Sequence, residues 1–254
     1  MHDRYLGCFS GVFNAMKTLL TFLILATTTL LSAQGIGGKG GLGGKSGMGG
    51  GVSLALAVRS SNMVANVAAS TTLTMPTGST VGDFAVIVMT TCETPGAAPT
   101  GWTLISNSSG SYYNGGIYYT TSGLTSGMIS SGVVVTTPGT YCGYIAVVDF
   151  IGAGIEVSSF ISQNSTNPTS VTSPTLSGAS VGNTVIWIAA ARGSNANATL
   201  SRGSLLQAGI TGGAGDGGLS IYSETLVAGF STAVTYTLGT YANGYYVGYI
   251  VVAP

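Results

Sequence analysis

Charged side chains are scarce in this sequence of 254 residues, of which only 6% are Asp, Glu, Lys or Arg. Lys plus Arg balance Asp plus Glu at seven each, so the chain has no basic stripe of the kind that binds nucleic acid. Lysine does not occur at all after residue 51. We therefore expect a β-protein with a hydroxyl-covered surface and no nucleic-acid partner.

The chain has one histidine, His2, which lies upstream of the leader described below. The mature chain would therefore contain no histidine. Without an imidazole, the mature chain can build neither a Ser-His-Asp or Cys-His nucleophile system nor a histidine zinc site. No local motif pairs two of its six acidic residues for glycoside hydrolysis: Asp83, Glu93, Asp149, Glu156, Asp216 and Glu224. We expect no catalytic residue, no metal and no cofactor, and predict that the protein is not an enzyme.

Apolar runs of about 18 residues, long enough to span a bilayer, are missing beyond the N-terminus. Residues 16–33 instead combine Lys17, a short apolar segment and the small Ala33, which is the pattern of a secretory signal peptide. We interpret 1–33 as a signal peptide with an upstream-start extension at 1–15, and an uncleaved membrane anchor is the alternative. Cleavage would leave a secreted, extracellular or cell-surface protein with no integral membrane segment.

Glycine is abundant, and it dominates 34–51 in three related units, GIGGKG, GLGGKS and GMGGG. Because glycine is conformationally free, this segment is predicted to be a flexible tether with a reach of about 20–25 Å. The GKS at 44–46 lacks the glycine that a phosphate-binding loop needs five residues earlier, where Lys39 stands. The regular Ile, Leu and Met spacing leaves association between tethers as an alternative.

Short apolar runs separated by Gly, Pro, Asn and Ser follow from residue 52, which is typical of an all-β sandwich. β-branched and aromatic residues dominate these runs. Strands are predicted at 84–90, 101–106, 116–121, 132–137 and 143–150. The continuous apolar stretch from Phe84 to Met89 predicts a strand covered on both faces. No stretch of the mature chain has a convincing helical period.

The second half of the chain repeats the first in order. TVGDFAVIV at 80–88 aligns with SVGNTVIWI at 180–188, TLI at 103–105 with SLL at 204–206, GGI at 115–117 with GGL at 217–219, and GTY at 139–141 with GTY at 239–241. The repeat predicts two tandem duplicated antiparallel β-sandwich units, Ig-like or jelly-roll-like and closely packed, at 52–153 and 154–254. Asp83 and Asn183 are interpreted as structural turn residues, and Asp149 and Glu156 as strand-end or seam residues.

Four strings of the first half, VGDFAVIVM, APTGWTLIS, GGIYYTTSG and GYIAVVDFIGA, together resemble a β-sandwich module of phage tail-associated and exported bacterial surface proteins. Such modules read Gly-Asp, an apolar strand, a Pro-rich turn, Gly-Trp-Thr and a Tyr-containing strand. The resemblance covers nearly all of 60–254, although the second half has Gly203 near the place of the Trp. It implies surface display, adhesion or fibre building, and it brings no catalytic residue.

Two cysteines belong to the mature chain, Cys92 and Cys142, because Cys8 lies within or before the leader. Cys92 ends one predicted strand and Cys142 precedes another. Their counterparts in the second half are Arg192 and Ala242, so both thiols are absent there together. We predict a disulfide, which would contribute about 2–4 kcal/mol, and two buried free thiols are the alternative.

Tyrosines cluster once in each half, at Tyr112, Tyr113, Tyr118 and Tyr119 and at Tyr241, Tyr245, Tyr246 and Tyr249. Neighbouring residues of a strand face opposite sides, so one of each adjacent pair is predicted to point outward. Exposed tyrosines would form a candidate binding surface for a glycan or a receptor. The alternative is ordinary aromatic pairing across strands.

These observations favour an exported, non-enzymatic structural or adhesive surface protein, such as a filament, coat or tail-fibre-like component. The absence of lysine, which commonly protects sheet edges, suits self-association into a homo-oligomer or filament. In one variant, VSLALAV at 52–58 pairs into a neighbour's sheet. The alternative function is a β-sandwich module that binds a glycan or a cell-surface receptor through the tyrosines.

Overall fold

The computed structural model of the chain describes residues 57–66, 68–107, 114–137, 142–151, 155–163, 168–192, 198–210, 217–227, 233–238 and 244–253. Within 155–163 and at Ile210 it describes the backbone alone. The predicted leader, the tether and the seam at 152–154 lie outside these residues. The described part belongs to one unit, Gly51–Pro254, and is nearly all β with antiparallel sheets.

The first half of the chain forms a five-stranded sheet with the order β1-β7-β3-β5-β4. Its strands are β1 (Ala57–Ala65), β3 (Phe84–Thr91), β4 (Trp102–Asn107), β5 (Asn114–Thr120) and β7 (Tyr144–Ile151). A two-stranded sheet joins β2 (Ser70–Leu73) to β6 (Val133–Thr136). The short helix α2 (Ser126–Ser131) precedes β6; it was not predicted, and the hydroxyl of Thr125 caps it by accepting the N–H of Met128.

The second half forms a five-stranded sheet with the order β8-β15-β10-β13-β12, the same succession of strands as in the first half. Its strands are β8 (Ile155–Gln163), β10 (Thr184–Arg192), β12 (Ser204–Ile210), β13 (Gly217–Thr225) and β15 (Gly244–Val252). A three-stranded sheet contains β11 (Thr199–Leu200), β14 (Thr235–Thr237) and β9 (Ser170–Thr172). Every pairing in both halves is antiparallel.

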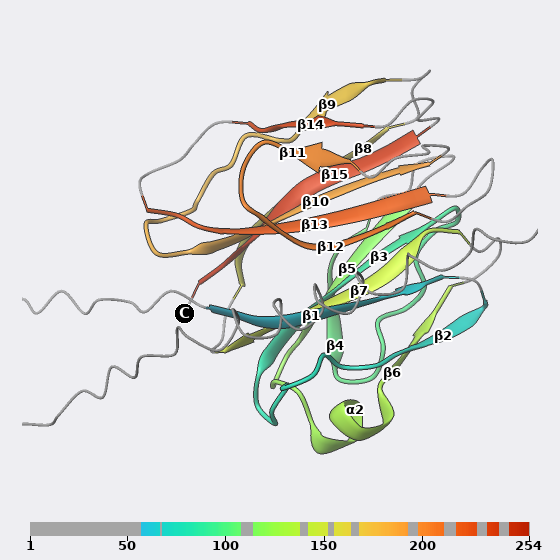
Figure 1. Ribbon diagram of the computed structural model, residues 1–254. Helices are drawn as coiled ribbons and strands as arrows, with labels where there is room; N and C mark the ends of the chain where they lie inside the picture. Colours follow the sequence, from blue (N-terminus) through green and yellow to red (C-terminus); the bar gives the residue numbers. More distant parts are fainter. Residues whose placement is uncertain are drawn as a thin grey trace, which may run out of the picture. The chain divides into compact units, whose positions relative to one another are not determined.

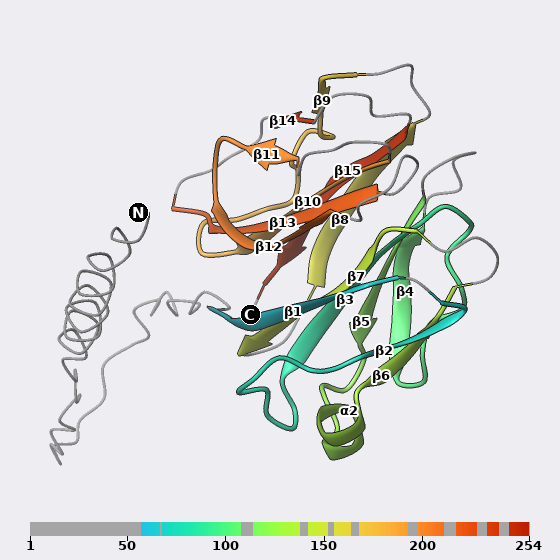
Figure 2. The same ribbon diagram turned by 45° about the vertical axis from the view of Figure 1, so that its right-hand side comes forward.

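Figures 1 and 2 show how the sheets are arranged. Three clusters of buried hydrophobic side chains lie between them. One packs β2 and β6 against the first five-stranded sheet, and a second packs β9 and β14 against the other. The third lies between the two five-stranded sheets. Each large sheet is therefore covered on both faces, and all of β3 is buried, which confirms the prediction made from Phe84 to Met89.

The paired strands of each large sheet are nearly equal in extent, so each sheet has two well-defined ends. Ala57, which starts β1, pairs with Ile151 at the end of β7, and Thr184, which starts β10, pairs with Val252. Only residues 152–154 separate β7 from β8, so the two sheets share this end, which we call the terminal end. The opposite end, which we call the distal end, is bounded by Asn107 and Asn114 in the first half and by Arg192 and Gly244 in the second.

Matching turns precede the central strands β3 and β10. The carboxylate of Asp83 accepts the backbone N–H of Thr80 at 2.7 Å, and the side-chain oxygen of Asn183 accepts that of Ser180 at 2.6 Å. Gly82, immediately before Asp83, has φ of 91°, the left-handed region that favours glycine. Asp83 and Asn183 thus close equivalent turns at the terminal end.

Candidate functional site

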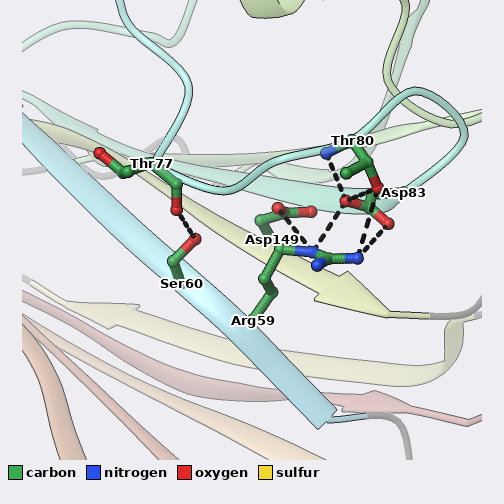
Figure 3. A network of polar contacts seen from close by, with 6 residues as sticks. All are labelled: Arg59, Ser60, Thr77, Thr80, Asp83 and Asp149. Atoms are coloured by element: carbon green, nitrogen blue, oxygen red, sulfur yellow. Dashed lines mark hydrogen bonds and ion pairs between the residues drawn. The ribbon is translucent and has the colours of Figure 1, made fainter.

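The most distinctive polar site is a buried ionic cluster of Arg59, Asp83 and Asp149 (Figure 3). Arg59 Nη2 donates to Asp83 Oδ1 at 3.0 Å, and Arg59 Nε lies 2.9 Å from Asp83 Oδ2. Arg59 Nε also lies 3.7 Å from Asp149 Oδ2. The side chain of Asp149 has 0% exposure, against 8% for Asp83 and 26% for Arg59.

Three elements position this cluster. Arg59 belongs to the edge strand β1, where the register with β7 shifts between Val58 and Ser60. Asp83 is held in its turn, where its carboxylate also accepts the hydroxyl of Thr80 at 2.8 Å. Asp149 lies in β7 opposite Ala85 of β3, inside the sheet. The cluster therefore ties the first strand of the fold to the sheet and to the turn before the central strand.

The two carboxylates have opposite pKa shifts. Burial raises the pKa of Asp149 and the charge of Asp83 adds to the rise, whereas Ser79, Arg59 and the backbone of Phe150 act against it. Burial also acts to raise the pKa of Asp83, but its hydrogen bonds with Thr80 and Arg59 outweigh burial and lower that pKa.

The cluster is built to hold strands together. Asp83 accepts from both Thr80 and Arg59, so its oxygens are engaged within the protein. Asp149 is fully enclosed and offers no surface to a substrate. Among the described residues, no three His, Cys, Asp or Glu side chains gather as metal ligands. The geometry supports a structural ion cluster, and it places Asp149 within β7, two residues before the end of that strand.

The sequence did not indicate Arg59, whose partners lie far along the chain, and it did not indicate a second charged cluster. In that cluster Arg202 donates to both carboxylate oxygens of Glu224. The guanidinium lies 5.6 Å from the ring centre of Trp187, whose Nε1 donates to Glu224 at 3.4 Å. The cluster fastens the turn before β12 onto the buried tryptophan of β10. Glu156 is described by its backbone alone, and Asp216 lies outside the described residues.

Four tyrosines of the proposed binding surface are buried: Tyr118, Tyr245, Tyr246 and Tyr249. The expectation that one of each adjacent pair points outward is wrong for Tyr245 and Tyr246, because their sheet is covered on both faces. Tyr245 packs toward the small sheet and Tyr246 into the core between the large sheets. Tyr119 is half-buried against that same core. The remaining three, Tyr112, Tyr113 and Tyr241, lie outside the described residues.

Two of the buried phenols, those of Tyr118 and Tyr249, donate internal hydrogen bonds. Tyr118 Oη donates to the carbonyl of Gly96 at 2.9 Å, and burial raises the pKa of Tyr118 to about 12. Tyr249 Oη donates to the carbonyl of Thr175 at 3.0 Å. Both residues thus anchor the segments that cross the outer face of each large sheet, which is a packing role.

The predicted disulfide between Cys92 and Cys142 is present, with Cα atoms 5.6 Å apart. It joins the chain after β3 to the chain before β7 at the distal end. Nearby, the buried Asn66 donates to the carbonyls of Thr90 and Cys142. The disulfide therefore reinforces neighbouring strands, and no thiol of this pair is free for chemistry.

A pocket of about 480 Å³ lies beside α2, lined by Pro99, Thr100, Gly101, Thr125, Gly127, Met128, Gly132, Val133 and Val134. Its lining contains no ionisable side chain.

In the described part of the chain, no helix is both long and apolar enough to cross a membrane. No protein-family model, curated protein or solved structure matches the chain.

Proposed function

We propose that the protein is an exported, non-enzymatic structural or adhesive surface protein that a glycine-rich tether displays by its terminal end. In this proposal 1–33 is the signal peptide, 34–51 the tether, and 52–153 and 154–254 are duplicated sandwich units of the kind found in phage tail-associated and exported bacterial proteins. The described tyrosines give no support to the glycan- or receptor-binding alternative, because their rings lie mostly in the interior.

The observation that carries the proposal is the position of the chain ends. Among the described residues, β1 starts at the terminal end, and residues 52–56 separate it from the proposed tether; β15 finishes at the same end. After cleavage of the leader, the far end of the tether would be the new N-terminus, and attachment through it would leave the distal end facing away from the surface. Loops at one end of a rigid sandwich are a common location for contacts with other molecules.

Duplication is supported by matched details in both halves. Leu104 of β4 and Leu205 of β12 each precede a register shift, and they pair with Tyr118 and Tyr222. The hydroxyls of these two tyrosines donate to backbone carbonyls of the segments before β4 and β11. Matches of strand order, register and hydrogen bonding at equivalent places favour descent from one sandwich unit.

Export is supported by the disulfide, because such bonds persist in oxidising compartments. All four edge strands of the large sheets carry a register shift. These shifts favour display over a filament that grows by pairing between sheet edges. The shifts lie at Arg59 of β1, Ile105 of β4, Glu156 of β8 and Leu206 of β12. Bulges of this kind obstruct pairing between sheet edges, a protection that lysine provides in many other proteins.

Surface labelling tests the proposal. Asn107, exposed at the distal end, and Val181, 61% exposed at the terminal end, would each be replaced by cysteine in the full chain. Intact producing cells or particles would then be treated with a membrane-impermeant maleimide. We expect strong labelling of Asn107→Cys and weak labelling of Val181→Cys, because the terminal end faces the attachment surface.

The purified, soluble protein provides the matched control, since both cysteines should then react at similar rates. Absence of labelling at both sites on intact cells, together with an uncleaved leader, would reject export. Equal labelling on cells and in solution would reject an oriented display. Sedimentation of purified protein into long polymers, with loss of that growth on deletion of 34–58, would instead favour assembly.

A further inference from the structure

The core between the two large sheets has the character of an interface between two partners. We call the first half 57–151 and the second half 155–253. Each half contributes eight buried side chains to this core. From the first half come Phe84, Val86, Val88, Ile117, Cys142, Ala146, Val148 and Phe150, and from the second Ile186, Ile188, Ala190, Leu219, Ile221, Tyr246, Ile250 and Val252. We call these two sets the pairing faces.

Four of the strand contacts across the pairing faces form two reciprocal pairs. Strand β1 lies against β12, and β4 against β8, so the edge of each sheet meets the opposite edge of the other. The central strands of the two sheets follow the same rule, with β7 against β13 and β5 against β15. Such an exchange of equivalent elements is the arrangement of a two-fold dimer, in which one partner's contact is repeated by the other.

Two tyrosines inserted against glycines make the pairing specific. The ring of Tyr246 in β15 packs on Gly115 of β5, where an added Cβ would overlap Cε1 of that ring. The ring of Tyr144 in β7 packs on Gly209 of β12, where an added Cβ would lie 2.7 Å from Cε1. Tyr144 and Tyr246 stand two residues before Ala146 and Gly248, which pair with Val88 and Ile188 at matching places in β3 and β10.

A polar contact and a steric difference add direction to the pairing. Gln207 Nε2 of β12 donates to Ser61 Oγ of β1 at 3.0 Å. Leu219, opposite Ala190, stands where the first half has Gly115, opposite Thr90. A second half facing another second half would therefore bring Tyr246 against a leucine. The glycine notch that accepts this ring belongs to the first half alone.

We infer that the pairing faces form a recognition surface that joins a first half to a second half without help from the connector at 152–154. The partner that the second half selects on this surface is the first half, and a second copy of the second half is rejected. The Cys92–Cys142 disulfide lies within the first half, so the connector is the sole covalent link between the described halves. This inference depends on the contacts between the sheets and not on export or display, so each can fail alone.

Cleavage of the full chain after folding tests this inference. A recognition sequence for a specific protease would be placed in the connector, and the folded protein would be cut under native conditions. Size-exclusion chromatography at micromolar concentration should then show the cut protein at the elution volume of the uncut chain, with both fragments in one peak. Fragments that elute separately would overturn the inference.

The selectivity is tested with Gly115→Leu, which gives the first half the residue of the second. After cleavage we expect at least a tenfold weaker association of the fragments, because the leucine occupies the place of the Tyr246 ring. Gly127→Leu is the matched control, since Gly127 lies in α2 with its nearest neighbour 3.9 Å from an added Cβ. Fragments of Gly115→Leu that associate as tightly as the control would overturn the selectivity.

A second pair of variants covers the case in which Gly115→Leu does not fold. Gly115→Ala adds one methyl group against the ring, and Tyr246→Leu removes the ring and leaves room for that methyl. The double variant should therefore associate more tightly after cleavage than Gly115→Ala alone. Equal or weaker association of the double variant would contradict a direct ring-on-glycine contact between the halves.

Discussion

Replacing Asp149 by valine should increase the free energy of unfolding at neutral pH. Val251, which pairs with Val185, stands at the place in β15 that Asp149, which pairs with Ala85, holds in β7. Val251 is fully buried, so this place in the fold accepts an apolar side chain. Arg59 would keep its shorter contacts with Asp83 after the substitution, so no cation would be left without a counter-charge.

The expected magnitude follows from three opposing terms. Arg59 attracts Asp149 across 3.7 Å, which is worth about 4 kcal/mol with the screening typical of a protein. Asp83 contacts the same guanidinium, and its negative charge offsets part of that attraction. The loss of hydration when the Asp149 carboxylate is buried costs several kcal/mol, and this cost also opposes the attraction. Replacements of buried ion pairs by apolar residues are commonly neutral or stabilising by about 1–4 kcal/mol, and we expect Asp149→Val in that range.

The pH dependence has a definite sign. Burial raises the pKa of Asp149, so below the ordinary pKa of a carboxyl the group is neutral in both the folded and the unfolded chain. As the pH rises, the unfolded chain ionises first, and wild-type stability falls until the pH exceeds the raised pKa of the folded protein. The advantage of Asp149→Val should grow over that interval and then stay constant.

Urea unfolding of the wild type and of Asp149→Val at a series of pH values measures this difference. Asp149→Asn is the matched control, because it removes the charge and keeps the shape, and its gain should be smaller since the amide is also buried. The reasoning would be refuted if Asp149→Val lost more than about 2 kcal/mol at neutral pH, as expected for removal of a required ion partner. A difference that did not change with pH would also refute it.

Three further substitutions give measurable outcomes. Arg59→Met should lose about 3–5 kcal/mol at neutral pH, because both carboxylates stay buried without a cation, and the loss should shrink in acid; a pH-independent loss in urea unfolding would count against this. Replacing Cys92 and Cys142 by alanine should cost about 4 kcal/mol, given a sequence separation of 50, and an unchanged Tm in calorimetry would contradict it. Glu224→Gln should cost about 1–3 kcal/mol and shift tryptophan fluorescence, and an unaltered spectrum would argue against the Arg202 contact.

Much of the fold could be read from local patterns. The apolar run at 84–89 identified a strand covered on both faces, and the repeated Val-Gly-Asp and Val-Gly-Asn placed equivalent turns at Asp83 and Asn183. The cysteine pair followed from the joint absence of both thiols in the second half. These features depend on neighbours in the sequence or on comparison of the halves, and they were predictable for that reason.

The prediction of an exposed tyrosine surface was wrong for β15, because this strand is covered on both faces as β3 is. Strand β15 reads GYYVGYIVV, in which apolar and polar residues do not alternate. This pattern indicates a strand covered on both faces, as it does for β3. The alignment of 115–117 with 217–219 was also wrong by two residues, because Val88 pairs with Ile117 and Ile188 with Ile221. Glycines at both places made the wrong alignment attractive.

The ionic cluster and helix α2 could not be predicted locally. Arg59 and Asp83 are separated by 24 residues, and Asp149 joins them only because β1 and β3 both pair with β7. Helix α2 has six residues and no buried side chain, so it lacks the apolar period that identifies a helix in a sequence.

The double coverage of each large sheet limits how many units such a chain can contain. One face of each large sheet is covered by a small sheet and the other face by the other large sheet. A third unit added after β15 would therefore find both faces of each large sheet already covered. Solenoid repeats differ, because each added repeat exposes a fresh surface for the next. Under the duplication proposed above, further growth of this architecture should therefore add whole pairs of units, each pair folded separately.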